Sequence, residues 1–280
     1  MRHHHVAGGG ETRLHVVESG DPAGRPIVFL HGWSQSHASW QRQLTSVALR
    51  GFRLVACDLR GHGDSDKPTV GYDDGSLWAA DLAAVLDALA LARPILVAWS
   101  YGGYVLADYV RAHGDGALRG IVTVGAATDM GRTAYRLLGD GWAGAFPDES
   151  GGPNTYSPGA EDAAIAMRRF VRNCVATPLD HLAELEWLGI TLSTPPRVRE
   201  ALFARRLAND DVLGSIRIPV VVAHGEDDRI VDVQTAYHLT EQIPRATLAL
   251  YPGIGHAPFW EASERFDREL AAFAGAPALA

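Results

Sequence analysis

Short apolar runs alternate with longer amphipathic stretches along most of this chain. A short continuous apolar run between turn-forming residues is typical of a strand buried inside a parallel sheet. Such runs occur at 26–30, 52–57, 95–99, 120–125, 218–223 and 246–251, and residues 12–18 alternate as an outer strand does. Helical spacing is found at 36–49, 76–92, 235–243 and 261–273, with another helix directly after Ser100. This strand–helix order predicts a doubly wound, mostly parallel α/β sheet, whose sites lie at the carboxyl ends of the strands.

The pattern changes between residues 127 and 213. A Gly-, Pro- and Ser-rich stretch at 139–159 is followed by three segments with helical character, at 160–175, 178–188 and 195–208, and no strand-like run is evident. We therefore expect a core made of 1–126 and 214–280, with 127–213 inserted as a helical cap, or lid, over the site. The alternative is a set of peripheral helices without a covering role.

The first thirteen residues carry three consecutive histidines and several glycines, without an apolar segment. They do not have the pattern of a secretory signal or a membrane anchor. We expect a frayed tail, with a weak metal-binding tract or the remnant of a tag as alternatives.

The centre of the chemistry is the apolar run that ends at Ser100. Gly102 and Gly103 follow at once, and a helical pattern then begins. A serine on such a strand–turn–helix junction is held in a strained conformation with its hydroxyl exposed, which is the nucleophile elbow. Its usual pattern is Gly-x-Ser-x-Gly; here Ala98 takes the first position. The alternative role for Ser100 is a helix N-cap.

A serine hydroxyl needs a base to take its proton, and a histidine on a loop near the site suits this task. His256 follows the last predicted strand, between Gly255 and Ala257. A carboxylate must orient its imidazole, in the chain order Ser, acid, His. The loop after residue 223 offers Glu226, Asp227 and Asp228, of which we choose Asp228; Asp129, after the preceding strand, is the alternative.

The same reaction needs N–H donors for the oxyanion. We expect the backbone N–H of Tyr101, next to the nucleophile, and that of Trp33, in the loop after the strand at 26–30. The Trp33 indole is also a candidate for the substrate pocket. Trp142, Phe146 and Trp187 are candidate pocket walls in the predicted cap, with packing inside the cap as the alternative for these three.

The remaining histidines are expected to have other roles. His31 is predicted to brace the oxyanion loop and His62 to belong to a structural turn. Structural or solvated positions are expected for His113, His181, His224 and His238. No histidine, cysteine or carboxylate cluster has metal-ligand spacing along the chain, and no Gly-Lys-Ser/Thr phosphate loop occurs, so no metal or cofactor is expected.

Composition narrows the class of protein. The chain has 280 residues and a formal net charge of −8, which does not favour a nucleic-acid partner. Cys57 and Cys174 are far apart, so we expect reduced thiols and no disulfide framework. No apolar run is long enough to span a bilayer. We expect a cytoplasmic protein with a small-molecule partner; the oligomeric state stays open.

Five ordered motifs resemble the α/β-hydrolase superfamily. They are His31-Gly32-Trp33, the loop from Asp58 to Ser65, Ala98-x-Ser100-x-Gly102-Gly103, His224-Gly225-x-x-Asp228 and Gly255-His256-Ala257-Pro258. The chain is most similar to the bacterial esterase and cofactor-free haloperoxidase (perhydrolase) group. The resemblance covers about 12–125 and 216–275 and implies an acyl-enzyme mechanism with Asp228 as the acid. Ala98 is the departure from the pattern.

The resulting hypothesis is a serine hydrolase of carboxylic esters or lactones, acting on a neutral, partly apolar substrate that is bulky or macrocyclic. Two further hypotheses use the same triad: hydrolysis of a C–C bond, and perhydrolysis of acids with peroxide. A non-enzymatic ligand receptor on the same fold is the hypothesis of a different class.

Overall fold

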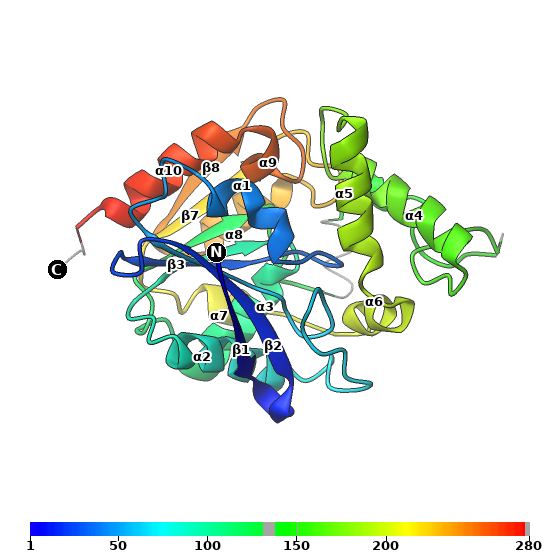
Figure 1. The fold of residues 1–280 in the computed structure, drawn as a ribbon. Coiled ribbons are helices and arrows are strands. Elements are labelled where there is room, and N and C mark those ends of the chain that lie inside the picture. The colour runs from blue at the N-terminus through cyan, green and yellow to red at the C-terminus, as the bar shows by residue number, and fades with distance from the viewer. Residues whose placement is uncertain (131–137, 150, 278–280) are drawn as a thin grey trace.

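The computed structural model describes residues 1–130, 138–149 and 151–277, and its centre is one eight-stranded sheet (Figure 1). The strand order is β1-β2-β4-β3-β5-β6-β7-β8. Strand β2 pairs antiparallel with both β1 and β4, and all other pairings are parallel. The predicted mostly parallel, doubly wound sheet is thereby confirmed.

The strands lie close to the predicted apolar runs. They are β1 (Arg2–Ala7), β2 (Arg13–Gly20), β3 (Pro26–Leu30), β4 (Arg53–Cys57), β5 (Ile95–Trp99), β6 (Gly120–Val124), β7 (Val220–Gly225) and β8 (Ala246–Tyr251). Every residue of β5 and β6 is buried. Their apolar runs have no polar face because the helices cover both sides of the sheet.

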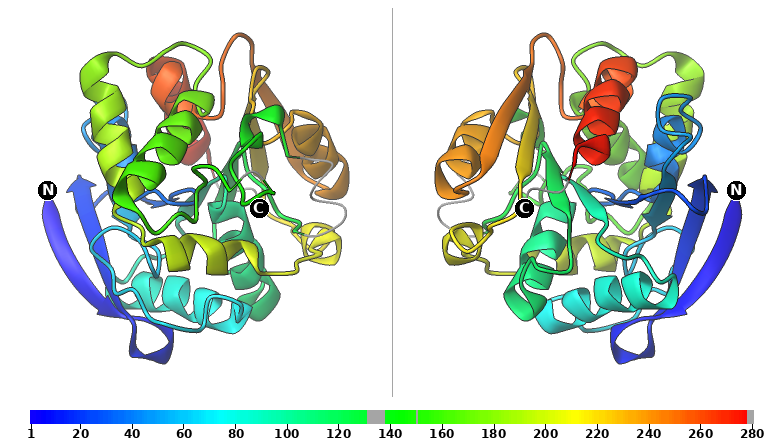
Figure 2. Two further views of the ribbon diagram at one scale, coloured as in Figure 1. Left: turned by 90° about the vertical axis from the view of Figure 1, so that its right-hand side faces the viewer. Right: turned by 90° about the vertical axis from the view of Figure 1, so that its left-hand side faces the viewer.

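Two groups of helices cover the sheet. One group is α2 (Gly75–Ala88), α3 (Gly102–His113), α7 (Asp210–Leu213) and α8 (Gln234–Gln242), and the other is α1 (Gln41–Leu44), α9 (Pro258–Glu261) and α10 (Ser263–Gly275). Figure 2 shows α8 and α10 on opposite sides of β7 and β8. Within the described ranges, no helix combines the length and the apolar character that crossing a membrane requires.

The expectation of a frayed N-terminus is wrong. Residues Arg2–Ala7 form β1, which pairs with β2 along its whole length. Side chains reinforce this pairing, because Glu18 of β2 accepts hydrogen bonds from Arg2 at 2.6 Å and from His4 at 2.8 Å. The histidine run concealed the strand, because only Val6 within it is a buried apolar residue.

Two predicted helices are shorter than expected. The segment 36–49 forms a 3-10 turn, η2 (His37–Trp40), and the single turn α1. The helix stops where Thr45 directs its hydroxyl onto the Gln41 carbonyl, a local bond that competes with helix continuation. Helix α2 begins after Asp74, which accepts the Ser76 N–H, and it ends before Ala90, whose φ is +49°.

The predicted insertion, residues 127–213, is mainly helical where the structure describes it; residues 131–137 and 150 lie outside the described part. It contains η4 (Asp140–Trp142), α4 (Ala160–Asn173), α5 (His181–Leu192), α6 (Pro196–Phe203) and α7. Helix α5 starts later than predicted because Asp180 caps it. Helix α6 ends earlier because Leu207 instead pairs with Met130 in an isolated bridge. Helices α4, α5 and α6 lie together at one end of the molecule (Figure 1).

Candidate active site

Ser100 occupies the strained turn that the sequence predicts, between β5 and α3. Its φ is +53°, in the left-handed region that side chains other than glycine rarely adopt. Two glycines make the turn possible: a Cβ at Gly102 would lie 2.9 Å from the Leu30 carbonyl oxygen, and one at Gly103 would lie 2.4 Å from that of Ala127. The structure therefore has the geometry of a nucleophile elbow.

The loop after β3 passes directly over the serine. A Cβ at Gly32 would lie 3.0 Å from the Ser100 Cβ, so only a glycine allows this approach. Among the described residues, the backbone N–H groups of Trp33 and Tyr101 have no hydrogen-bond acceptor. An oxyanion hole requires N–H donors that are free to bind the oxyanion, and these two amides meet that requirement.

Two histidines hold this loop in place. His31 Nε2 accepts the Leu59 N–H at 3.0 Å, and His62 Nε2 accepts the Ser34 N–H at 3.2 Å. Both imidazoles are fully buried, and burial lowers the pKa of His31 to about 4 and that of His62 to about 3. They are therefore neutral hydrogen-bond acceptors at neutral pH, which agrees with the predicted bracing role.

His256 lies on the loop after β8 and is paired with Asp228. Its Nδ1 is 2.7 Å from Asp228 Oδ2, and the His256 and Asp228 side chains are both buried. Gly125 leaves room for the pair, because a Cβ there would lie 2.9 Å from His256 Nδ1. With the carboxylate accepting at Nδ1, the Nε2 atom of His256 stays available as a base.

Asp228 is held by four donors. Its Oδ1 accepts the N–H groups of Ile230 at 2.8 Å and Val231 at 2.9 Å. Its Oδ2 faces His256 and, at 3.2 Å, the Nε2 of His224. Although burial opposes the charge, these imidazoles and hydrogen bonds hold the pKa of Asp228 well below its usual range.

The other candidate acids lie elsewhere. Glu226 and Asp227 are exposed on the same loop. Asp129 accepts the backbone N–H of Asn209 at 2.7 Å, so its carboxylate takes part in fixing the end of the insertion. The structure thus pairs Asp228, and neither neighbour nor Asp129, with His256.

The loop that carries His256 is tied to the serine strand and to the insertion. The indole of Trp99, the residue before Ser100, donates to the His256 carbonyl at 2.9 Å, and the two rings lie 5.5 Å apart. The His256 N–H donates to the Cys174 carbonyl at 3.0 Å. These contacts place His256 at the same sheet edge as Ser100.

Three of the four predicted pocket residues lie in one aromatic cluster. Trp33 contacts Trp142 with ring centroids 5.5 Å apart, and Trp142 stacks on Phe146 at 5.3 Å. Phe170 and Phe203 complete the cluster. Trp187 is separate: it packs between Trp99 and Trp260. The aromatic cluster therefore joins the insertion to the oxyanion loop.

Sequence reasoning missed Arg199, on α6. The residue is 1% exposed, and its Nε and Nη1 have no hydrogen-bond partner among the described residues. Burial lowers the pKa of this guanidinium to about 10. Its carbonyl accepts the Trp33 indole N–H at 3.3 Å, which places the residue backbone beside the oxyanion loop. No sequence signal separates this arginine from the many exposed ones.

His224 was expected in a structural or solvated position, and it is buried with its Nε2 2.9 Å from the Val231 carbonyl oxygen. Its contact with Asp228 was not expected. This contact arises from a tight turn that brings residues i and i+4 together. The Asp228 carboxylate raises the pKa of His224 despite its burial. A turn of this kind cannot be read from apolar periodicity.

Comparison with known proteins agrees with this geometry. A family model described as alpha/beta hydrolase fold matches residues 25–263. The chain belongs to the alpha/beta hydrolase family. This alpha/beta hydrolase superposes on the crystal structure of the esterase RhEst1 from Rhodococcus sp. ECU1013 with a TM-score of 0.92 and 39% identity, covering 99% of each chain.

Two sequence relatives are named as haloperoxidases rather than as esterases. The non-heme chloroperoxidase CPO-A1 of Kitasatospora aureofaciens is 33% identical over 89% of this chain and 92% of its own length. A non-heme haloperoxidase of Rhodococcus erythropolis is 30% identical over 90% and 92%. The resemblance to the bacterial esterase and haloperoxidase group is thus confirmed.

Proposed function

We propose that this protein is a serine hydrolase that cleaves carboxylic esters or lactones through an acyl-enzyme. The observation that carries the proposal is a buried His256–Asp228 pair at the sheet edge that presents Ser100 in a strained turn. The Trp33 and Tyr101 amides, which have no acceptor within the described part of the chain, are the proposed oxyanion donors. The similarity to an esterase over 99% of the chain supports the same reaction class.

The proposed reaction has two halves. His256 takes the Ser100 proton as the hydroxyl oxygen attacks the ester carbonyl, and the Trp33 and Tyr101 N–H groups stabilise the oxyanion. His256 then protonates the leaving alcohol, which completes the ester cleavage. In the second half His256 activates a water molecule, which releases the acid and restores Ser100. Asp228 holds the imidazole and stabilises its charged form throughout.

We also propose that the insertion covers the site as a cap, with Trp33, Trp142 and Phe146 as apolar pocket walls and Trp187 behind Trp99. The contact of Trp33 with Trp142 supports this arrangement. A panel of esters and lactones of increasing size, compared by kcat/KM, tests it. A strong preference for large alcohols supports the cap as the selector, and a flat profile contradicts that role.

The first experiment removes the nucleophile. Ser100→Ala is expected to lower p-nitrophenyl acetate turnover by a factor on the order of 10⁴ or more, and to abolish labelling by a fluorophosphonate. Ser215→Ala, in the segment before β7, is the matched control and should keep both. Equal turnover in the wild type and Ser100→Ala would contradict the enzyme proposal and favour a ligand receptor.

Perhydrolysis is the second candidate, favoured by the relatives that are named non-heme haloperoxidases. In this reaction hydrogen peroxide, in place of water, attacks the acyl-enzyme and leaves as a peracid. The measured ratio of peracid to acid, at fixed peroxide with acetate esters, distinguishes the two. A ratio near zero identifies water as the acceptor that the site selects.

A further inference from the structure

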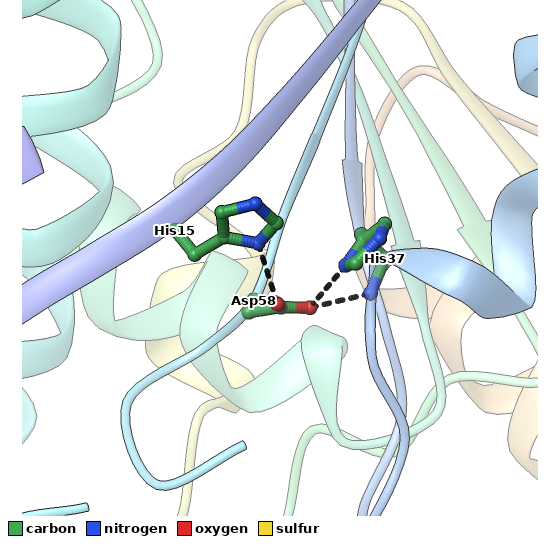
Figure 3. Close-up of side chains that lie close together, drawn as sticks. All are labelled: His15, His37 and Asp58. Atoms are coloured by element: carbon green, nitrogen blue, oxygen red, sulfur yellow. Dashed lines mark hydrogen bonds and ion pairs between the residues drawn. The ribbon is translucent and has the colours of Figure 1, made fainter. Parts of the chain in front are cut away.

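Far from the elbow in sequence, two histidine side chains converge on one carboxylate. Asp58 follows β4, His15 lies in the middle of β2, and His37 begins η2. His15 Nδ1 is 2.9 Å from Asp58 Oδ2, and His37 Nδ1 is 2.9 Å from Asp58 Oδ1 (Figure 3). The two imidazoles thus approach one carboxylate from two sides with the same ring nitrogen.

The ligand atoms of this cluster have the spacing that a metal ion requires. One nitrogen from each histidine and one Asp58 oxygen all lie within 4.8 Å of one another. Ligands about 2.0 Å from a tetrahedral ion are about 3.3 Å apart. The His15 and His37 ring centroids are 5.0 Å apart, and the Nδ1 atom of each ring faces the Asp58 carboxylate. The Nδ1–oxygen distances, now 2.9 Å, need to increase only to about 3.3 Å for an ion to bind between these atoms.

The charges of the cluster also favour a cation. Asp58 has no exposed surface, and in the described part of the chain its ion-pair partners are imidazoles, without a lysine or arginine. Several other buried carboxylates have a fixed cation; Asp81 pairs with Arg60 and Asp108 with Arg205, both at 2.7 Å. The exposed carboxylate of Asp64 lies 3.9 Å from His15 Nδ1 and can approach as a fourth ligand.

A second shell is already in place. His15 Nε2 lies 2.9 Å from Nδ1 of His3, on β1. Metal-binding histidines usually donate their other ring N–H to a fixed acceptor, which orients the ring. The Asp58 oxygens accept the backbone N–H groups of His37 at 2.7 Å and Asp64 at 2.9 Å, which fix the carboxylate.

We propose that His15, His37 and Asp58 form a binding site for a divalent transition-metal ion, with Zn²⁺ as the ion that fits best. Two imidazoles and one or two carboxylates are ligands that Zn²⁺ accepts in tetrahedral geometry. The ion would join β2, the loop after β4 and the segment that follows the oxyanion loop. The site is separate from Ser100, His256 and Asp228.

Binding changes the positions of protons but requires no redox step. Each Nδ1 now faces a carboxylate oxygen and carries the proton of that hydrogen bond. Coordination needs a free lone pair on Nδ1, so each neutral imidazole shifts its proton to Nε2. In His15 this Nε2–H then donates to His3 Nδ1, and the proton that His3 Nδ1 carried moves to the Nε2 of that exposed ring. His37, with a side chain 20% exposed, donates to solvent.

Local sequence spacing led to the opposite expectation, that no metal is bound. The three residues are separated by 22 and 21 positions, because His15, His37 and Asp58 belong to three different segments. Only the pairing of β2 with β4 and the fold of the loop after β3 bring them together.

The test is a titration of the chelator-treated full-length protein with Zn²⁺ alone, using a chromophoric chelator as competitor, repeated with Co²⁺ to read geometry from its visible spectrum. One equivalent of Zn²⁺ and a tetrahedral Co²⁺ spectrum are expected. His37→Gln should weaken binding at least 10-fold and His3→Gln about 10-fold. Because His37 is partly exposed, its variant is expected to fold even if Asp58→Asn does not.

Two control variants separate this site from other histidines. His238→Gln removes the other described histidine–carboxylate group, formed with Asp129 and Asp210, and His4→Gln removes a β1 histidine that pairs with Glu18. Both should bind Zn²⁺ as the wild type does. Unchanged binding in His37→Gln, or loss of binding in either control, would overturn the proposal. Neither result depends on esterase activity.

Discussion

Two buried aspartates in this molecule have nearly the same surroundings. Asp228 and Asp58 each face two imidazoles and each accept two backbone N–H groups. Each carboxylate is kept ionised by these donors, which hold its pKa far below the usual range against the effect of burial. One belongs to the proposed triad and the other to the proposed metal site.

The difference lies in how the imidazoles are distributed. At Asp228 both approach Oδ2, while Oδ1 takes the two backbone donors. At Asp58 each oxygen faces its own imidazole, His15 on Oδ2 and His37 on Oδ1. At Asp228 the two rings share one oxygen, and His256 is the closer of the two, at 2.7 Å against 3.2 Å for His224. Two separate oxygens leave the rings converging on a space between them.

The largest effect is expected when each aspartate is replaced by the isosteric asparagine. Asp228→Asn should lower kcat by about 10⁴-fold, because the amide stabilises the wrong imidazole tautomer and no longer stabilises the imidazolium. Asp58→Asn should change kcat by less than about 10-fold but lower the free energy of unfolding by about 2–3 kcal/mol, since charged hydrogen bonds are lost. Ester kinetics and urea denaturation measure the two quantities.

Equal losses of kcat in Asp58→Asn and Asp228→Asn would contradict the different roles proposed for the two aspartates. A loss of about 10⁴-fold in folded Asp58→Asn would mean that the loop after β4 takes part in the chemistry. Full activity in Asp228→Asn would remove Asp228 from the proposed triad.

His31 and His62 are buried histidines that accept backbone N–H groups, and they are expected to make the free energy of unfolding depend on pH. His31 and His62 have lowered pKa values, about 4 and about 3, so the unfolded chain binds more protons than the folded one below pH 6.5. Stability should therefore fall as the pH decreases, by roughly 2 kcal/mol per histidine between pH 7 and pH 5. His15, whose pKa Asp58 raises, acts in the opposite direction: its contribution is present below pH 6.5 and is lost as the pH rises through its folded pKa.

Urea denaturation at pH 7 and pH 5 measures this effect. His62→Gln can keep an acceptor for the Ser34 N–H at the position of His62 Nε2 but does not titrate. The decrease between the two pH values should therefore be smaller by roughly 2 kcal/mol than in the wild type. An identical decrease in both proteins would show that His62 is not the source.

The smallest effect concerns the second imidazole at Asp228. His224→Asn removes a hydrogen bond to Asp228, the carboxylate of the proposed triad, and we expect kcat to fall about 10-fold, the equivalent of about 1.4 kcal/mol. KM should stay unchanged, because His224 holds Asp228 and is not a proposed substrate contact. Steady-state kinetics give the split between kcat and KM, with His238→Gln as control. A rise in KM at constant kcat would contradict the positioning role.

Strands β2 to β8 and the motifs of the proposed triad were predictable because both depend on short stretches of sequence. An apolar run such as Ile95–Trp99 is buried on both sides and has no other stable position. Ser100, Asp228 and His256 follow the ends of three strands, so the strand order brought them to one edge of the sheet. The glycines beside Ser100 had a local steric reason, which the structure supports.

The features that were missed depend on contacts between distant segments. Strand β1 has a polar sequence, and it forms because it pairs with β2 and because Arg2 donates to Glu18. Arg199 is buried only because the insertion folds against the oxyanion loop. The convergence of His15 and His37 on Asp58 likewise has no local signature. Periodicity describes one segment at a time and cannot report such partners.

One clasp between the insertion and the His256 loop limits how this protein can be re-engineered. Glu261 accepts the N–H groups of Gly255, Ala176 and Thr177, next to the bond from the His256 amide to Cys174. A chimera that exchanges the insertion for that of another family member must therefore retain the backbone course of 174–177. If the splice points fall inside this stretch, the graft removes the hydrogen bonds that support the backbone of His256, the proposed general base.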